Sequence, residues 1–279
     1  MQTTENNKKV LADIHQVQLK MMNTILSALE EHHITYYLGY GTFLGAVRHS
    51  GFIPWDDDVD IQLPYKDYRR FLKLCKKALN PNDYEIQSSE DMGNNFLFSK
   101  IRAKGTFIPT IYNSGADLEG NGIWIDFFGV IYAAGTDKWI EKQMALLRGT
   151  QKIKTKYLGY TKKNSLKNFA KRIINLGLFL LCKTTFFLAR IIGEWSNHTE
   201  CINIGTAYYE VHSPELCRKK GSLLPAKLFE KKKKYPFEGS SFYGVEDYDT
   251  YLCACYTKNY MIPDRSYTHV TDYSKVIIQ

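Results

Sequence analysis

Hydrophobic residues recur at helical spacing in four long stretches of the chain and at alternating positions in several short ones. A period near 3.6 residues indicates a helix with one buried face, and a period of two indicates a half-buried strand. The predicted helices span residues 10–33, 65–79, 138–156 and 167–195, and the predicted strands span 34–38, 58–63, 84–87, 96–102, 107–112 and 122–130. Helices and strands mixed along the chain predict an α/β protein, and no repeat or low-complexity linker divides residues 1–279, so we expect one domain.

Four carboxylates crowd into residues 56–60, just before the apolar alternation of a strand. Period two places Asp58 and Asp60 on one face; Asp56 shares their parity, whereas Asp57 has the opposite parity. Neighbouring like charges repel by about 1 kcal/mol in water and about 4 kcal/mol at an effective dielectric constant of about 20. A cation would relieve this repulsion, and hard oxygen ligands favour Mg²⁺ or Mn²⁺ at Asp56, Asp58 and Asp60. The alternative is a solvated acidic turn.

An EF-hand loop also begins with acidic residues at alternate positions, as in Asp56, Asp58 and Asp60. Such a loop needs glycine at its sixth position and glutamate at its twelfth. This chain has Ile61 and Asp67 at those positions. The sequence therefore argues against an EF-hand.

A glycine-rich turn precedes the acidic residues. Residues 39–49 read Gly-Tyr-Gly-Thr-Phe-Leu-Gly-Ala-Val-Arg-His, which predicts a strand-to-helix junction with Thr42 as the helix N-cap. Such a junction presents backbone N–H groups and the positive end of a helix dipole, so Gly41 and Thr42 are suited to bind phosphate. The alternative is a plain turn. Arg48 is suited either to a bidentate phosphate contact or to a salt bridge with a nearby aspartate.

A second unusual acid is Asp126, the one charge in the apolar run 122–130, which reads as a central strand. A buried carboxylate needs a metal, an arginine or a cage of hydrogen bonds, so Asp126 is a candidate metal ligand or general base. In the strand 96–102, Lys100 and Arg102 share one parity and are candidates to face one ligand. The alternative is that they form a solvated face.

The composition is that of a folded protein with a basic balance. The 279 residues are 44 % hydrophobic and 24 % charged, and the formal net charge is +8, which favours polyanionic partners. No RNA- or DNA-binding module is recognisable, so we expect no nucleic-acid partner. Residues 1–9 are polar and lack the apolar core of a signal peptide, which leads us to expect a cytoplasmic protein.

The segment 137–200 is predicted to be helical and basic. Its apolar part, 167–195, is interrupted by charged residues, so no uncharged span reaches the roughly 20 residues of a membrane crossing. The interrupting residues are Lys171, Arg172, Lys183 and Arg190. Two interpretations stay open: a buried helical hairpin, or a basic amphipathic surface that rests on the anionic inner face of the cell membrane.

A phosphate-binding turn, an Asp-x-Asp strand and a later strand aspartate are the parts of a two-metal phosphotransfer site. Their order resembles the nucleotidyltransferase fold of the polymerase-β type. Gly41-Thr42 stands where that superfamily has Gly-Ser, and residues 58–61 stand where it has an Asp-hydrophobic-Asp-hydrophobic strand. The resemblance implies a mixed sheet flanked by helices, with the helical segment 137–200 as an insertion.

Longer motifs resemble the LicD family. They are residues 37–49 with 51–60, which carry the glycines, Trp55 and the acids; residues 122–128, around Asp126; and the tail segments Phe237-Glu238-Gly239 and 248–252, with Tyr260, Met261 and Pro263. The resemblance covers most of residues 10–265, and its first block is highly specific.

The LicD family, and the fukutin-type proteins related to it, are phosphotransferases. The resemblance implies transfer of a phospho-alcohol, most often phosphocholine from CDP-choline, to a hydroxyl of a cell-surface glycan or its lipid-linked precursor. CMP would leave, and Mg²⁺ or Mn²⁺ would be the cofactor. By the resemblance Asp56, Asp58, Asp60 and Asp126 bind metal, and the last three are catalytic. Gly41, Thr42 and Arg48 contact phosphate, with Lys100 and Arg102 as further candidates.

The tail departs from the family pattern. Residues 256–261 replace a Tyr-Gly-Asp-Tyr-Met run, so its acid is lost and one residue is added. We expect this change to lie away from the metal motif and to affect the choice of donor or acceptor. Two alternative functions remain: a nucleotidyltransferase that moves NMP to an acceptor, and a non-catalytic module that binds a glycan or a partner.

Overall fold

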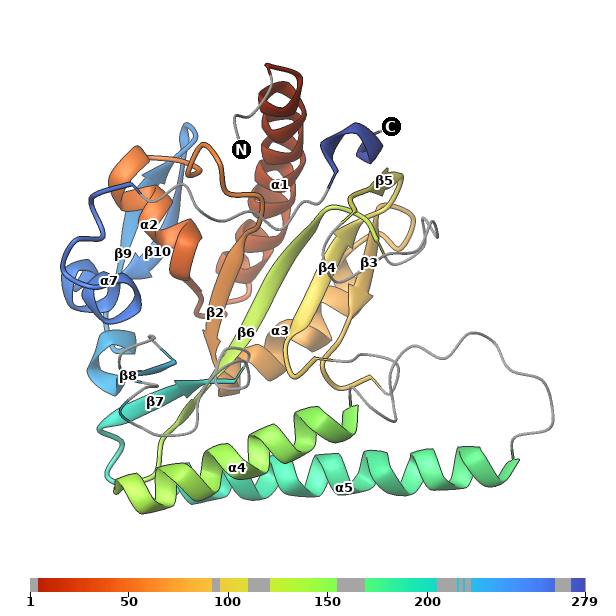
Figure 1. The fold of residues 1–279 in the computed structure, drawn as a ribbon, viewed down its shortest axis with the longest axis vertical. Coiled ribbons are helices and arrows are strands. Elements are labelled where there is room, and N and C mark those ends of the chain that lie inside the picture. Colours follow the sequence, from red (N-terminus) through yellow and green to blue (C-terminus); the bar gives the residue numbers. More distant parts are fainter. Residues whose placement is uncertain are drawn as a thin grey trace.

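A computed structural model describes residues 5–91, 96–109, 121–154, 169–204, 215, 218, 222–263 and 272–278. It shows helices and strands mixed along the chain, as predicted, around one curled sheet (Figure 1). The α/β class is therefore confirmed.

Seven strands of the described chain form a mixed sheet. Five of them have the order β1-β2-β6-β4-β3, β7 pairs with the C-terminal end of β6, and β8 pairs with β7. These strands are β1 (Tyr37–Leu38), β2 (Asp60–Pro64), β3 (Tyr84–Gln87), β4 (Ser99–Ala103), β6 (Trp124–Tyr132), β7 (Glu200–Asn203) and β8 (Leu223–Pro225). Only β2 and β6 run parallel among the paired strands of this described sheet. The run around Asp126 is thus central, as predicted.

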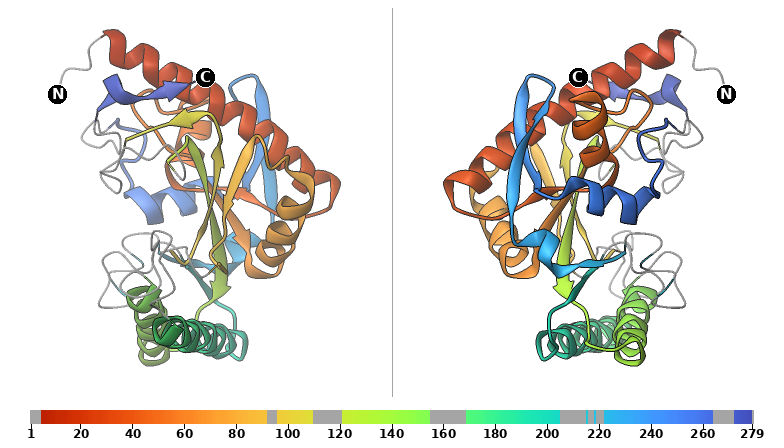
Figure 2. Two further views of the ribbon diagram at one scale, coloured as in Figure 1. Left: turned by 90° about the vertical axis from the view of Figure 1, so that its right-hand side faces the viewer. Right: turned by 90° about the vertical axis from the view of Figure 1, so that its left-hand side faces the viewer.

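Two helices cover one face of the sheet, α1 (Glu5–Glu31) and α3 (Tyr65–Ala78), as Figure 2 shows. The ring of Phe71 on α3 stacks on Phe127 of β6 with ring centroids 4.4 Å apart. Val59, Ile61 and Leu63 are fully buried in the same core. Their shared burial confirms the predicted parity, because Asp60 then belongs to the opposite face.

The predicted boundaries differ from the structure near the acidic residues. The ladder of β2 begins at Asp60, so Asp58 lies in the extended segment before the strand. The helix α2 (Tyr40–His49) begins before Thr42, and its N-cap is Gly39. The N-cap prediction for Thr42 was therefore wrong: the threonine hydroxyl accepts a hydrogen bond from the backbone of Asp60 instead.

The edge of the sheet at β1 is covered by the C-terminal part of the chain (Figure 1). The hairpin β9 (Lys232–Phe237) and β10 (Ser240–Val245) and the helix α7 (Tyr248–Tyr256) lie there beside α2. The four lysines 231–234 do not form the tip of this hairpin: three of them lie in β9, and the turn falls at Glu238-Gly239. In the second half of β9, exposed Lys234 and Pro236 alternate with buried Tyr235 and Phe237, the pattern of a half-buried strand. The remaining short elements are β5 (Thr106–Phe107), the 3₁₀ helices Ala226–Phe229 and Tyr273–Lys275, and β11 (Ile277–Ile278).

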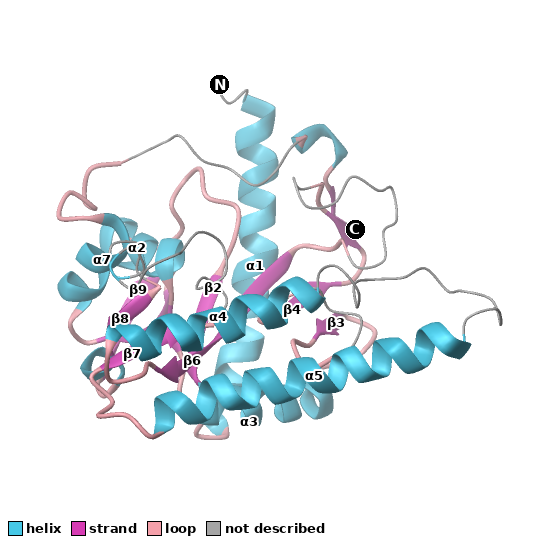
Figure 3. Ribbon diagram, turned by 60° about the horizontal axis from the view of Figure 1, so that its bottom comes forward, coloured by secondary structure: helices cyan, strands magenta, loops and turns pink. Residues whose placement is uncertain are grey.

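The helices α4 (Asp137–Ile153) and α5 (Phe169–Glu194) run side by side across one end of the sheet (Figure 3). They fall in the segment 137–200 that the sequence predicts to be helical and basic. Residues 155–168 of that segment and residues 110–112 of a predicted strand lie outside the described chain.

Candidate functional site

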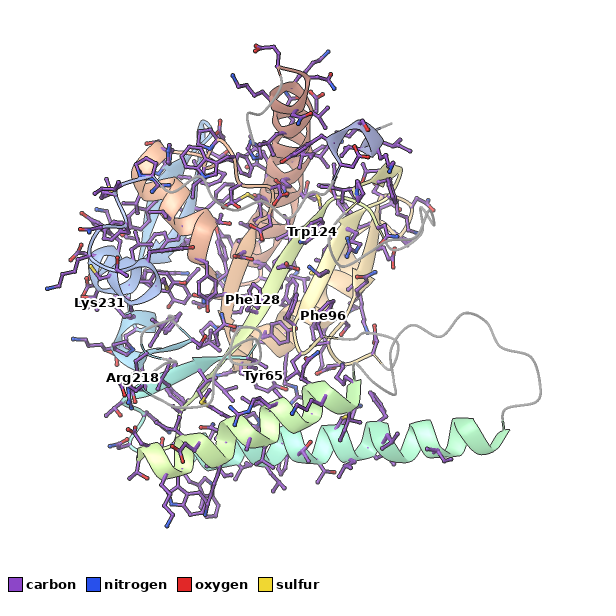
Figure 4. The ribbon with its side chains drawn as sticks, in the orientation of Figure 1. Tyr65, Phe96, Trp124, Phe128, Arg218 and Lys231 are labelled. Atoms are coloured by element: carbon purple, nitrogen blue, oxygen red, sulfur yellow. The ribbon has the colours of Figure 1, made fainter. Side chains whose placement is uncertain are left out.

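Three of the predicted site residues lie in one row across the sheet. Asp60 on β2 is the register partner of Asp126 on the parallel strand β6, and Asp126 is the register partner of Lys100 on β4. Register partners point to the same face, so the two carboxylates and the ammonium group are neighbours. This is the face opposite to α3, and the side chains of Trp124 and Phe128 lie along it (Figure 4).

Lys100 holds the carboxylate of Asp126. Its Nζ donates to Oδ1 at 2.6 Å and to Oδ2 at 2.8 Å, and Trp124 Nε1 donates to Oδ2 at 3.0 Å. The ammonium also lies 4.8 Å from the ring centroid of Trp124 and 5.1 Å from that of Phe98. Burial lowers the pKa of Lys100, while Asp126 acts in the opposite direction. The chain itself therefore supplies the cation that a buried Asp126 requires.

Asp60 concentrates the negative charge of the site. Loss of water contact, followed by the charges of Asp58, Asp126 and Asp56, holds the pKa of Asp60 well above its usual range, and Lys100 opposes this only in part. The three further aspartates thus act on one carboxylate from the loop before β2 and from β6. This convergence is what the carboxylate pattern of the sequence predicts.

The backbone around Asp60 is fixed on both sides. Its N–H donates to Thr42 Oγ1 at 2.8 Å, and its carbonyl accepts from the N–H of Gly39 at 2.9 Å. Asp126 N–H donates to the carbonyl of Val59 at 2.8 Å. The first turn of α2 and the strand β6 therefore set the position of the acidic residues together.

Position 41 needs a glycine because the carboxylate of Asp56 lies close to its backbone. A methyl group placed on Gly41 would lie 2.5 Å from Oδ2 of Asp56. The carboxylate thus lies against the first turn of α2, where the helix dipole favours a negative charge. A phosphate bound at this turn would meet Asp56, so the two anions need a cation between them.

Arg48 and Arg102 are bonded to the protein rather than directed at the row of Asp60. Arg48 Nη1 donates to the carbonyl of Tyr260 at 2.7 Å, and Asp56 and Tyr256 are close enough to oppose the burial that lowers the pKa of Arg48. Arg102 donates to Gln87 Oε1 at 3.0 Å and to the carbonyl of Gly122 at 2.8 Å. Arg102 and Lys100 do share one face, since both cations lie over Trp124.

Two residues of α1 that the sequence pattern does not single out hold the acidic loop. His15 Nε2 donates to the carbonyl of Asp56 at 2.7 Å, and Gln18 Nε2 donates to the carbonyl of Asp57 at 2.9 Å. Gln18 is fully buried on the otherwise apolar face of its helix. That polar residue in an apolar stripe is the signal that would have found it. Asp57 is fully buried. It does not belong to the row that Asp60 forms with Asp126 and Lys100.

Tyr256 is another missed residue. Its hydroxyl lies 3.9 Å from the position that a Cβ would take at Gly41. Loss of water contact, then Cys255 and the carboxylates of Asp56, Asp60 and Asp58 hold the pKa of Tyr256 well above its usual range. The segment 256–261 therefore begins at the acidic site. The expectation that its departure from the family pattern lies away from the metal motif was wrong, because α7 folds back against α2.

The tail also supports the loop before the acids. Glu238 Oε1 accepts from the N–H of Phe52 at 3.1 Å, and Glu238 N–H donates to the carbonyl of Ser50 at 2.9 Å. The same carboxylate lies where a side chain on Gly51 would need to be. Sequence motifs almost two hundred residues apart thus form one structural unit.

The chemistry of the site fits a divalent cation. Hard carboxylate oxygens gather around Asp60, and their mutual repulsion is what such a cation relieves. Within the described residues, no group of three or more acidic, histidine or cysteine side chains is arranged to hold one ion. Asp126 is bound to Lys100 instead. An ion at this site would have Asp56, Asp58 and Asp60 as its candidate ligands, and their side chains would have to draw together around it.

The fold and the site define a mixed α/β protein with aspartates gathered on adjacent parallel strands. Residues 33–163 match the family described as LicD/FKTN/FKRP, nucleotidyltransferase domain. This part of the chain is a LicD-family domain. It contains every site residue that the sequence predicts.

Three curated relatives match parts of the chain. The lipopolysaccharide cholinephosphotransferase LicD of Haemophilus influenzae is 35 % identical over 85 residues, which are 30 % of this chain and 32 % of the relative. Two uncharacterised Rickettsia proteins match as well. The Rickettsia typhi protein is 30 % identical over 34 % of this chain and 32 % of its own length. The Rickettsia prowazekii protein is 44 % identical over 32 % of this chain and 39 % of its own length. The matched region thus spans about a third of the length of these relatives.

Proposed function

We propose that this protein is a metal-dependent phosphotransferase that moves a phospho-alcohol from a CDP-alcohol to a hydroxyl of a cell-surface glycan or its lipid-linked precursor. The observation that carries the proposal is the placement of Asp60 beside Asp126, with Asp58 and Asp56 close enough to raise the pKa of Asp60. The LicD-family domain and the name of the Haemophilus relative, a cholinephosphotransferase, support the same reaction and favour CDP-choline as donor.

In the proposed reaction the acceptor hydroxyl oxygen bonds to the phosphorus that carries the alcohol. The bond from that phosphorus to the bridging oxygen breaks, CMP leaves, and the hydroxyl proton passes to a base, for which Asp126 is the candidate. Asp56, Asp58 and Asp60 would hold Mg²⁺ or Mn²⁺, which would offset the negative charge that develops on the phosphoryl oxygens. The other roles belong to the chain: Lys100 and Trp124 fix Asp126, and the first turn of α2 fixes Asp60.

The phosphate contacts of the donor are proposed for the first turn of α2, at Gly41, and for Arg48. Arg48 retains one partner on the tail and lies near Asp56. Lys100 and Arg102 contribute positive charge from β4 while bonded to Asp126 and to Gly122. Thr42 acts through Asp60, because its hydroxyl accepts the N–H of that residue.

The test is a transfer assay with Mg²⁺ and a panel of CDP-choline, CDP-ribitol and CDP-glycerol, with alkyl glycosides as acceptors. CMP release and a product mass increased by one phospho-alcohol support the proposal. A product carrying a whole nucleotide would instead show nucleotidyl transfer, the activity named in the description of the family domain. Activity that survives exhaustive chelation would overturn the metal mechanism.

A non-catalytic role is tested with the same protein. Calorimetry measures the binding of CDP-choline with and without Mg²⁺, using the Asp60→Asn variant as the matched control. Mg²⁺-dependent binding that the variant loses supports the proposed site. If no donor binds and no CMP is released, the proposed reaction is wrong, and the non-catalytic binding module is the alternative that stays.

A further inference from the structure

The helix α5 exposes large apolar side chains along the side that faces away from the protein. Leu180 is 55 % exposed and Phe187 is 52 % exposed. Leu176, Leu181 and Leu188 are exposed as well. At 100° per residue, Leu176, Leu180 and Phe187 fall on one stripe. Exposed apolar patches of this kind mark interaction surfaces.

The opposite side of α5 is bound to the protein. Gln143 of α4 donates to the carbonyl of Ala189 at 2.8 Å, and the hydroxyls of Thr150 and Thr185 lie 2.6 Å apart. Gly193 packs directly against the carbonyl of Tyr132 on β6. Ala189 is fully buried in this contact. The helix is therefore fixed along its inner side, and its outer apolar side has no covering in the described chain.

Two tryptophans mark one end of this surface. Trp195 follows the last residue of α5 and is 86 % exposed, and Trp139 of α4 is 48 % exposed. The contacts of Gln143 and Thr150 show that α4 and α5 run antiparallel, so Trp139, one turn before Gln143, lies at the end of α5 that carries Trp195. Exposed tryptophans are typical of side chains that insert at the boundary between lipid and water.

Basic residues outnumber acidic ones in the two helices that carry this surface, because α4 and α5 together hold eight lysines and arginines and three acids. Lys183 is an exposed residue of α5, and Lys142 lies 4.1 Å from the ring centroid of Trp139. The helix α3 has six lysines and arginines and one acid, and it borders a cavity of about 960 Å³ that Arg190 of α5 also lines. Five lysines and arginines line this cavity against three acids. Figure 4 shows Tyr65 at this junction, between the end of the sheet and α5, where it contacts Phe186.

One helix of the described chain, Leu176–Glu194, is long and apolar enough by length and composition to cross a membrane. A crossing would surround the helix with lipid, whereas its inner side is hydrogen-bonded to α4 and packed on β6. We infer instead that the outer face of α5, with Trp139 and Trp195, lies flat on an anionic lipid bilayer. A second copy of this chain would bring Lys183 and the bordering basic residues of both copies together, so charge favours lipid.

The inference is independent of the proposed reaction and is tested by co-sedimentation with vesicles. The full chain is mixed with vesicles of phosphatidylglycerol and phosphatidylcholine, and with vesicles of phosphatidylcholine alone. We expect binding to the anionic vesicles that weakens as salt is added. The Leu180→Ser/Phe187→Ser variant should bind at least about tenfold more weakly, since one large apolar side chain corresponds to roughly one factor of ten.

The matched control is Met261→Ser/Ile262→Ser, because these residues are also exposed, at 52 % and 69 %, and lie in the turn after α7 rather than on α5. It should bind as the wild type does. Circular dichroism and thermal unfolding should be unchanged in both variants. Absence of wild-type binding, or equal loss in both variants, would overturn the inference. A dimer that dissociates only in the Leu180→Ser/Phe187→Ser variant would show that a second copy covers this face, and would overturn it too.

Discussion

Lys100 and Asp126 face each other across the antiparallel strands β4 and β6, and the lysine ammonium bonds to both carboxylate oxygens, at 2.6 and 2.8 Å. Their side chains are only 11 % and 9 % exposed. This pair allows Asp126 to lie at the centre of the sheet beside Asp60 without leaving an unbalanced buried charge. It also means that a substitution at either position acts on stability as well as on activity.

Removing one partner of this pair should be costly. We expect Lys100→Met and Asp126→Leu each to lower the free energy of unfolding by about 3–5 kcal/mol, because each leaves a buried charge alone. The double variant should lose clearly less than the sum. Urea unfolding followed by fluorescence measures all three. Lys76→Met, in the exposed pair with Asp91, is the control and should change stability by at most about 1 kcal/mol. Additive effects in the buried pair would contradict the prediction.

Asp60→Asn should separate activity from stability. Because the pKa of Asp60 is raised, the folded protein binds a proton at this carboxylate more tightly than the unfolded chain does. Without metal, the free energy of unfolding therefore falls as the pH rises from about 3.8 through the raised pKa. The variant should therefore unfold at a higher temperature than wild type at pH 7 in chelator. Transfer should fall by at least about a hundredfold, the size seen when one group that stabilises the transition state is lost. Mg²⁺ should raise the unfolding temperature of wild type only; a similar rise in the variant would place the ion elsewhere.

Gly41→Ala should disturb the site without unfolding the protein. The added methyl would lie 2.5 Å from Oδ2 of Asp56, so that carboxylate must move. We expect weaker Mg²⁺ binding by calorimetry and a loss of transfer, with the far-ultraviolet circular dichroism unchanged. Gly149→Ala is the matched control, because nothing lies within 4 Å of its added methyl. In helix α4 this control should stabilise by about 0.5–1 kcal/mol. Equal activity of the two variants would refute the role given to Gly41.

The buried Lys154 predicts a pH dependence far from the site. Its Nζ donates to the carbonyl of Ser89 at 2.5 Å, and burial lowers its pKa to about 8. A lowered pKa on a base means that the unfolded chain binds more protons between pH 8 and about 10.5, so this lysine makes stability rise with pH across that range. The difference in the free energy of unfolding between wild type and Lys154→Met should change by about 3 kcal/mol over this range. Urea unfolding at several pH values measures it, and a constant difference would contradict the shift.

The sequence by itself determined which carboxylates are unusual and which face of the strand they occupy. Alternation in a strand is a local property, so the burial of Val59, Ile61 and Leu63 followed from the pattern and left Asp60 on the other face. The need of Asp126 for a counter-charge also followed, because burial of a lone carboxylate is costly wherever it occurs. The motif around residues 37–60 was specific enough to indicate the LicD family, which the domain match confirms.

Only the tertiary structure decided which groups meet. The cation at Asp126 is Lys100, because the antiparallel register of β4 and β6 pairs them, and register is set by the whole sheet. Gln18 reaches Asp57, and Tyr256 reaches Gly41, over separations that no local pattern encodes. From its sequence, the apolar helix α5 fitted either a buried hairpin or a membrane-facing surface. The structure shows that one side packs on α4 and that the other is exposed, which hydrophobicity alone does not determine.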